Sequence, residues 1–171
     1  MSGPYTVTVK LAYPGTPLFD DNTGQIPTGE TSQAGHMWYS ISDGQTSTSY
    51  GFRPLEAGAI PGPGERVDTA DKVYQNPGYT RALEITAEPY ERLREYGEDA
   101  VRGDSWRYFN GRYHGVANSC IDFTWGALRH AGLQQSRTAV DYFQGELREE
   151  VHGVPNAYDG SLKVMPNRDA L

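Results

Sequence analysis

The chain has 171 residues, of which 37% are hydrophobic and 22% charged, and its net charge at pH 7 is −7. This length suits a single domain with its own core, and an acidic chain without a basic stripe argues against nucleic-acid binding. One cysteine excludes an internal disulfide, and the four scattered histidines lack metal-ligand spacing, so we expect neither a metal nor a cofactor.

The first third of the chain predicts an antiparallel sheet. Residues 5–13 (YTVTVKLAY) alternate and are β-branched, which indicates a strand, whereas residues 14–35 are rich in turn formers and predict a long loop. Residues 36–42 (HMWYSIS) predict a second strand. An Asp-Gly turn at 43–45 joins it to a third strand over 46–54.

The middle of the chain alternates between irregular and regular segments. Residues 55–78 hold many glycines and prolines, so they exclude a central strand or a long helix and predict a surface excursion. A strand follows over 79–85, and Thr86 can cap a helix that runs to about Arg102. The apolar residues of that helix form one inward stripe: Tyr90, Leu93, Tyr96, Gly97 and Ala100.

The last third predicts two helices. Residues 103–117 are aromatic and irregular, which indicates a short strand or hairpin. A buried helix then begins after Asn118 as N-cap and stops at Gly132. Residues 140–151 predict an amphipathic helix, and residues 153–171 predict a loose tail.

These elements predict one α+β domain over residues 1–171, in which an antiparallel sheet packs against helices. No internal repeat is present, and no linker divides the chain into two domains. No apolar run reaches the roughly 18 residues of a membrane-spanning helix, so we expect no membrane span. The first ten residues, MSGPYTVTVK, lack the pattern of a signal peptide, which predicts synthesis in the cytoplasm without such a leader.

The only cysteine, Cys120, lies at the start of the second predicted helix. A helix N-terminus carries partial positive charge and free N–H groups, which favour a thiolate and can hold the oxyanion formed when a carbonyl is attacked. Asn118 suits the N-cap, and Asp122 places a carboxylate in the first turn. The alternative is an unreactive buried thiol, because free cysteine is among the most buried residue types.

His36 is the best candidate for a base that activates this thiol, because it opens a strand and can face a helix N-terminus across a cleft. A purely structural histidine is the alternative. His130 lies about 15 Å from the start of the cysteine helix, at ~1.5 Å per residue, so it is excluded as a partner and fits the helix dipole instead. His114 is a candidate for a cleft wall.

A third polar group would orient the imidazole. With Asp43-Gly44 as the hairpin turn, Ser49 is the polar residue nearest to His36 on the neighbouring strand. A slip of one residue in the turn would place Thr48 or Tyr50 there instead, because such a slip exchanges the two faces of a strand.

Three motifs follow one another between Ala34 and Leu133: GHMWYSISDG, then SYGFRP, then NSCIDFTWGALRHAGL. This order resembles the circularly permuted papain-like (NlpC/P60-type) cysteine hydrolases, in which a Gly-His strand precedes an Asn-x-Cys-x-Asp-Phe helix. The resemblance implies a permuted papain-like fold with its core at about 34–133 and the nucleophile at a helix N-terminus. It also implies His36 as general base and Cys120 as nucleophile, framed by Asn118, Asp122 and Phe123.

Members of this family include peptidoglycan amidases and endopeptidases, other cysteine peptidases and lipid acyltransferases. Small members without a signal peptide resemble antibacterial effector toxins carried by type VI secretion, which cut peptidoglycan stem peptides and are blocked by a dedicated immunity protein. The resemblance therefore implies export by a non-classical system into the periplasm of a target cell. It implies a secretion-apparatus carrier and an immunity protein as partners.

Three interpretations follow from the sequence. In the first, Cys120 attacks an amide carbonyl to form a thioester and His36 moves the proton, while Trp38, Tyr113 and His114 wall the substrate groove. In the second, the same nucleophile acts as an acyltransferase, or as a thioesterase or lipid-ester hydrolase. In the third, the chain is a non-catalytic binding module in which Cys120 is merely buried.

Overall fold

The structure is a computed structural model, and it describes residues 4–32, 35–56, 61–102, 108–114 and 119–133. The predicted helix over 140–151, the predicted tail over 153–171 and the candidate residue Asn118 lie outside these described residues.

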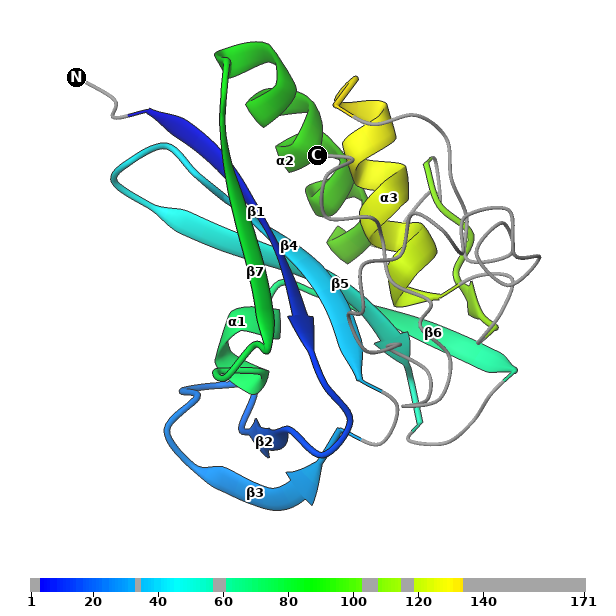
Figure 1. Ribbon diagram of the computed structural model, residues 1–171. Coiled ribbons are helices and arrows are strands. Elements are labelled where there is room, and N and C mark those ends of the chain that lie inside the picture. The colour runs from blue at the N-terminus through cyan, green and yellow to red at the C-terminus, as the bar shows by residue number, and fades with distance from the viewer. Residues whose placement is uncertain (1–3, 33–34, 57–60, 103–107, 115–118, 134–171) are drawn as a thin grey trace, which may run out of the picture.

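A six-stranded sheet forms the scaffold, with the strand order β7-β1-β4-β5-β6-β8 (Figure 1). Each neighbouring pair in it is antiparallel, which confirms the predicted α+β class. A separate two-stranded sheet pairs β2 with β3. The strands are β1 (Tyr5–Ala12), β2 (Pro17–Phe19), β3 (Pro27–Thr31), β4 (His36–Ser42), β5 (Ser47–Pro54), β6 (Gly62–Val67), β7 (Tyr79–Ile85) and β8 (Arg112–Tyr113).

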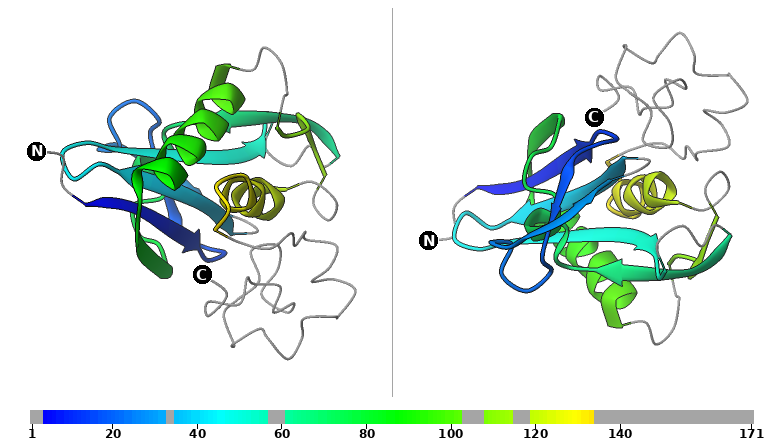
Figure 2. Two further views of the ribbon diagram at one scale, coloured as in Figure 1. Left: turned by 90° about the horizontal axis from the view of Figure 1, so that it is seen from above. Right: turned by 90° about the horizontal axis from the view of Figure 1, so that it is seen from below.

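Helices cover both faces of this sheet. The longer helices α2 (Ala87–Arg102) and α3 (Cys120–His130) lie on one face, and the short helix α1 (Ala70–Val73) lies on the other, next to β2 and β3 (Figure 1). Figure 2 shows α3 against the twisted sheet, with β1 and β4 on one side of it and β6 on the other. Within the described part of the chain, no helix is both long enough and apolar enough to span a membrane.

The alternation of side chains along the central strands divides the core into two clusters. Odd-numbered residues of β1 and β4 face α2 and α3 and form the main cluster with them. The even-numbered Ala12 and Trp38 face α1 and form a second, smaller cluster there with Ala70, Val73 and Tyr74. The predicted inward stripe of α2 is confirmed at Leu93, Tyr96, Gly97 and Ala100, and Tyr90 is half-buried.

Two predicted irregular segments contain regular structure. Within 14–35 the chain forms the β2–β3 hairpin, because the Asp20 carboxylate accepts the backbone N–H groups of Thr23, Gln25 and Ile26 and closes a tight turn. A composition rich in turn residues is therefore compatible with either a hairpin or an irregular loop, and composition alone does not distinguish the two.

The prediction of a surface excursion over 55–78 is wrong at Gly62–Val67 and at Ala70–Val73, which form β6 and α1. β6 lies inside the sheet, between β5 and β8. Glycine is required at position 64 because the backbone of β6 lies close to the ring of Phe52, and a Cβ there would overlap that ring. Glycine in this strand therefore reflects packing against an aromatic ring, whereas the sequence suggested a break in secondary structure.

We predict that Gly97→Ala destabilises the protein by about 2 kcal/mol or more, although alanine favours a helix over glycine by about 1 kcal/mol. A Cβ at position 97 would overlap the ring of Tyr50, which is fully buried and donates its hydroxyl to Glu98 at 2.7 Å. Chemical denaturation measures the change. The control is Arg92→Ala on the exposed side of the same helix, expected within ~0.5 kcal/mol of the wild type. Equal stability of Gly97→Ala and the wild type would contradict the packing of α2 on β5.

Candidate functional site

Cys120 is the first residue of α3, as the sequence predicted for a helix start. The N-cap is Ser119, not Asn118: the Ser119 hydroxyl accepts the Ile121 N–H at 3.3 Å, and the Asp122 carboxylate accepts the Ser119 N–H at 2.9 Å. This reciprocal arrangement is a capping box, which the Ser-x-x-Asp spacing in the sequence could have revealed. Asp122 therefore holds the helix start in place, which confirms its expected position in the first turn.

The thiol of Cys120 is buried, with 2% of the residue exposed. Burial raises the pKa of this thiol to about 11, although hydrogen bonds from the Met37 backbone N–H, the Tyr113 hydroxyl and the Ile121 backbone N–H each act to lower it. Loss of solvation therefore outweighs the helix N-terminus, which by itself favours the thiolate. The resting group is a neutral thiol that is already surrounded by hydrogen-bond donors.

His36 opens β4 as predicted, and its side chain is buried, with 3% of the residue exposed. Its ring stacks on Tyr74 at a centroid distance of 4.5 Å and on Trp38 at 5.7 Å. Burial, and to a lesser degree Arg53, lower the pKa of His36 from 6.5 to about 3. Its Nε2 has no hydrogen-bond partner among the described residues. At neutral pH the imidazole is therefore uncharged.

The structure does not bring the thiol and the imidazole into contact: the His36 ring stacks on Trp38 and Tyr74 of the second cluster, whereas Cys120 belongs to the main cluster. Pairing of β4 with β5 ends at Trp38 and Gly51, while β5 continues along β6 as far as Pro54. Met37, the neighbour of His36, directs its N–H to Cys120 there. Tyr74 is near both groups: it stacks on His36, and burial and then Cys120 raise the pKa of its phenol to about 12.

Ser49 does not lie against His36. It pairs with Ser40, because the hairpin loop is closed by the Asp43 N–H bonding to the Thr46 carbonyl at 3.3 Å, which shifts the register from the expected one. The Ser49 hydroxyl donates to the Asp68 carbonyl at 3.3 Å and accepts the Asp71 N–H at 3.0 Å. Ser49 therefore anchors the start of α1, and the proposed orienting role is not supported by its contacts.

The residues predicted to wall a groove separate into two groups. Trp38 is fully buried and its indole N–H donates to Asp71 at 2.7 Å, so it belongs to the core under α1 rather than to an open groove. Tyr113 is buried, and its hydroxyl meets the Cys120 thiol. His114 follows it and is exposed. Of the three, Tyr113 is the one that the structure brings to the nucleophile.

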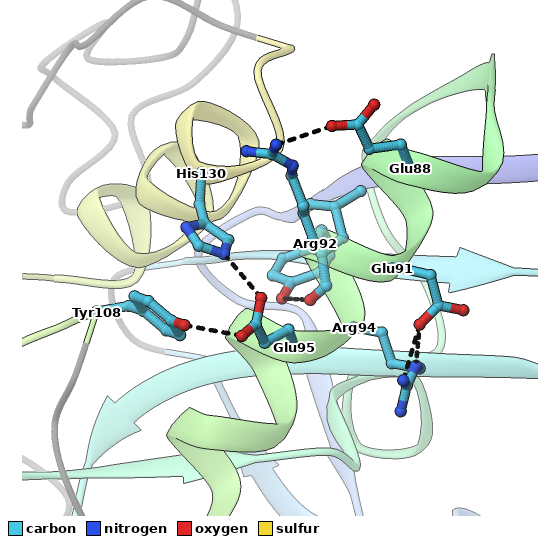
Figure 3. A network of polar contacts seen from close by, with 9 residues as sticks. Glu88, Glu91, Arg92, Arg94, Glu95, Tyr108 and His130 are labelled. Atoms are coloured by element: carbon cyan, nitrogen blue, oxygen red, sulfur yellow. Dashed lines mark hydrogen bonds and ion pairs between the residues drawn. The ribbon is translucent and has the colours of Figure 1, made fainter.

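His130 lies at the opposite end of α3 from Cys120, as the sequence predicted. Its Nε2 is 3.4 Å from a Glu95 carboxylate oxygen, and the Tyr108 hydroxyl donates to the other oxygen at 2.9 Å (Figure 3). This cluster joins α3 to α2 and takes no part in the site around Cys120. Its distance from the nucleophile makes His130 a suitable control position for experiments on His36.

Comparison of the chain with protein-family models, with curated proteins and with solved structures found no match. Among the described residues, no group of three His, Cys, Asp or Glu side chains is placed to hold a metal ion. The chemistry of the site is therefore inferred from its own residues.

Sequence reasoning missed Tyr74, Gly51 and the N–H of Met37. Tyr74 was assigned to the surface excursion, and no local periodicity marks it, because it reaches the site only when α1 folds onto the sheet. The role of Met37 belongs to its backbone, which side-chain patterns do not report. Gly51 stands in the SYGFRP motif, but the imidazole that lies over it is identified only by the fold.

Proposed function

We propose that this protein is a cysteine hydrolase that cleaves an amide bond, built on a permuted papain-like (NlpC/P60-type) fold. One observation carries the proposal: Cys120 is the first residue of α3, where the Met37 and Ile121 N–H groups and the Tyr113 hydroxyl act to lower the pKa of its buried thiol. Donors grouped around a nucleophile favour its anionic form and hold an oxyanion. A neutral histidine directly precedes one of these donors in the chain.

The proposed reaction begins with both groups uncharged. As the Cys120 sulfur attacks the amide carbonyl carbon, its proton passes to Nε2 of His36, and backbone N–H groups hold the oxyanion. Collapse of this intermediate breaks the C–N bond, and His36 returns the proton to the leaving amine. Water, deprotonated by His36, then attacks the thioester carbonyl, the C–S bond breaks, and His36 returns the proton to the Cys120 sulfur as the carboxylic acid is released. The imidazole and thiol must meet for this reaction, and catalytic groups often reach such contact only with substrate bound.

Peptidoglycan stem peptides are the proposed substrate, on the basis of the resemblance of the three sequence motifs. The same resemblance supports a role as an antibacterial effector toxin that type VI secretion delivers into the periplasm of a target cell. A secretion-apparatus carrier and a dedicated immunity protein are the corresponding proposed partners. Each of these statements depends on the hydrolase assignment.

The burial of the thiol favours a second candidate, a non-catalytic binding module. Cys120 is part of the main hydrophobic cluster, and its raised pKa is that of an inert core cysteine. The two candidates differ in one measurable respect: a hydrolase forms a covalent acyl-cysteine, whereas a binding module does not.

The test is digestion of purified peptidoglycan, with the soluble products analysed by mass spectrometry. We expect the wild type to release fragments that have gained one water across an amide bond, and we expect His36→Gln to slow release by roughly a hundredfold or more. His130→Gln is the matched control, with unchanged release. Joining of the acyl group to an added amine without gain of water would indicate an acyltransferase. Absence of both products, and of an acyl-cysteine, would favour the binding module.

A further inference from the structure

We propose that Tyr74 and Gly51 are the positioning residues that set the ring of His36, in the place that a polar third residue would take in a catalytic triad. This inference deepens the proposed function and rests on His36 as its general base. In a triad, a hydrogen bond orients the imidazole. Here the ring of Tyr74 stacks against the imidazole, and the absence of a side chain at Gly51 leaves space for its Nε2.

Tyr74 provides the stacking surface. Its ring lies nearly parallel to the imidazole, with an interplanar angle of 17° and a centroid distance of 4.5 Å. Trp38 adds a second near-parallel ring at 20°, and Tyr74 and Trp38 also contact each other at 5.3 Å. The three rings therefore form one cluster, in which rotation of the imidazole would break two contacts at once.

Gly51 provides the space for the reactive nitrogen. A Cβ at position 51 would lie 3.0 Å from Nε2 of His36 and 3.4 Å from the Cβ of Ala70. Because Ala70 belongs to α1, on the side from which Tyr74 packs, the imidazole has little room to move away from an added methyl group. Glycine therefore lets Nε2, the atom that accepts the proton in the proposed reaction, lie close to the backbone of β5.

The helix that carries Tyr74 is fixed to three strands. Ser49 of β5 accepts the Asp71 N–H, and the Asp71 carboxylate accepts bonds from the Trp38 indole and the Lys10 ammonium, each at 2.7 Å. Tyr74 is the C-cap residue of this helix, and its backbone N–H bonds to Ala70. Ser49 thus contributes to the position of His36 indirectly, through α1.

Few charged or titratable groups act on the imidazole. Arg53 of β5 is the charged group that lowers the pKa of His36, and it is itself paired with Asp21 at 2.9 Å and Glu65 at 3.0 Å. The α1 segment presents the Asp71 carboxylate, which is bonded to the Trp38 indole and to Lys10, and its C-cap residue Tyr74, which stacks on the ring; β1 pairs the apolar Ala12 with His36. A change in the titration of His36 on altering Tyr74 therefore reports on burial and stacking, provided that Arg53 is retained.

The experiment compares Tyr74→Leu with Tyr74→Phe in the full chain, using NMR titration of the His36 imidazole and the rate of peptidoglycan hydrolysis. Leucine removes the stacking ring, so we expect the titration midpoint to rise by at least about one pH unit and hydrolysis to fall by roughly tenfold or more. Phenylalanine keeps the ring and should keep both values close to the wild type. The control is Tyr90→Leu on α2, which removes a half-buried ring that is tilted against Tyr5 with a centroid distance of 4.7 Å.

Gly51→Ala is the second variant, and it decides the matter if Tyr74→Leu does not fold. We expect it to lower hydrolysis by roughly tenfold while thermal unfolding remains cooperative. An unchanged His36 midpoint together with unchanged hydrolysis in either folded variant would overturn the inference. If the wild type hydrolyses nothing, the proposed function fails, whereas the NMR titration still shows whether Tyr74 sets the environment of His36.

Discussion

Cys120→Ser is expected to abolish amide hydrolysis while the protein stays folded. Serine replaces sulfur by a hydroxyl that can still accept hydrogen bonds from the Met37 and Ile121 N–H groups, so the first turn of α3 keeps its partners. A serine hydroxyl ionises far less readily than a thiol, so the hydroxyl of the Cys120→Ser variant would be a much weaker nucleophile in the same surroundings. The expected loss of rate is roughly a thousandfold or more.

Thr124→Ser is the matched control for this substitution. Thr124 is buried one turn further along α3, and its hydroxyl donates to the Cys120 carbonyl at 3.0 Å. Serine keeps that bond and removes one methyl group, which costs about 1 kcal/mol of stability without touching the nucleophile. The two variants should therefore have similar melting temperatures but different activities. A Cys120→Ser protein as active as the wild type would remove Cys120 from the mechanism.

Acid is expected to destabilise the protein through His36 before the carboxylates contribute. The imidazole is buried uncharged, with a folded pKa of about 3, whereas in the unfolded chain it titrates near 6.5. Between these values the unfolded state binds the additional proton, so stability is fully present above about pH 6.5 and falls as the pH is lowered. The expected loss from this residue is about 2.5 kcal/mol between roughly pH 6 and pH 4.

Urea denaturation at several pH values measures this slope. The pKa values of Asp20, Asp21 and Asp43 are lowered by hydrogen bonds, chiefly from Thr23, Arg53 and Thr46 respectively, and their contribution is lost mainly below about pH 4. Above about pH 4, the free energy of unfolding of His36→Gln should change much less with pH than that of the wild type, whatever the absolute stability of the variant. His130→Gln should keep the pH dependence of the wild type. A wild type equally stable at both ends of this range would contradict a buried neutral His36.

Local periodicity was sufficient for the elements that frame the site. The alternation in residues 36–42 and the 3–4 spacing after Cys120 depend on neighbouring residues only, and both elements are present at these positions. Segments with the composition of loops were harder to predict. In the sequence, Pro63 and Gly64 suggest a break in secondary structure. In the fold they belong to β6, where Gly64 allows close contact with the ring of Phe52 and the strand pairs with β5 and β8.

The amino-acid sequence by itself determined that one cysteine begins a buried helix and that His36 opens a central strand, because capping and alternation are local properties. The tertiary structure decided the chemistry of both groups. Burial by β4, α3 and Tyr113 outweighs the helix N-terminus and keeps the thiol protonated. The ring of Tyr74, brought from a segment 38 residues further along the chain, meets His36 only after α1 packs on the sheet. Desolvation and stacking depend on the whole fold, and no sequence window contains them.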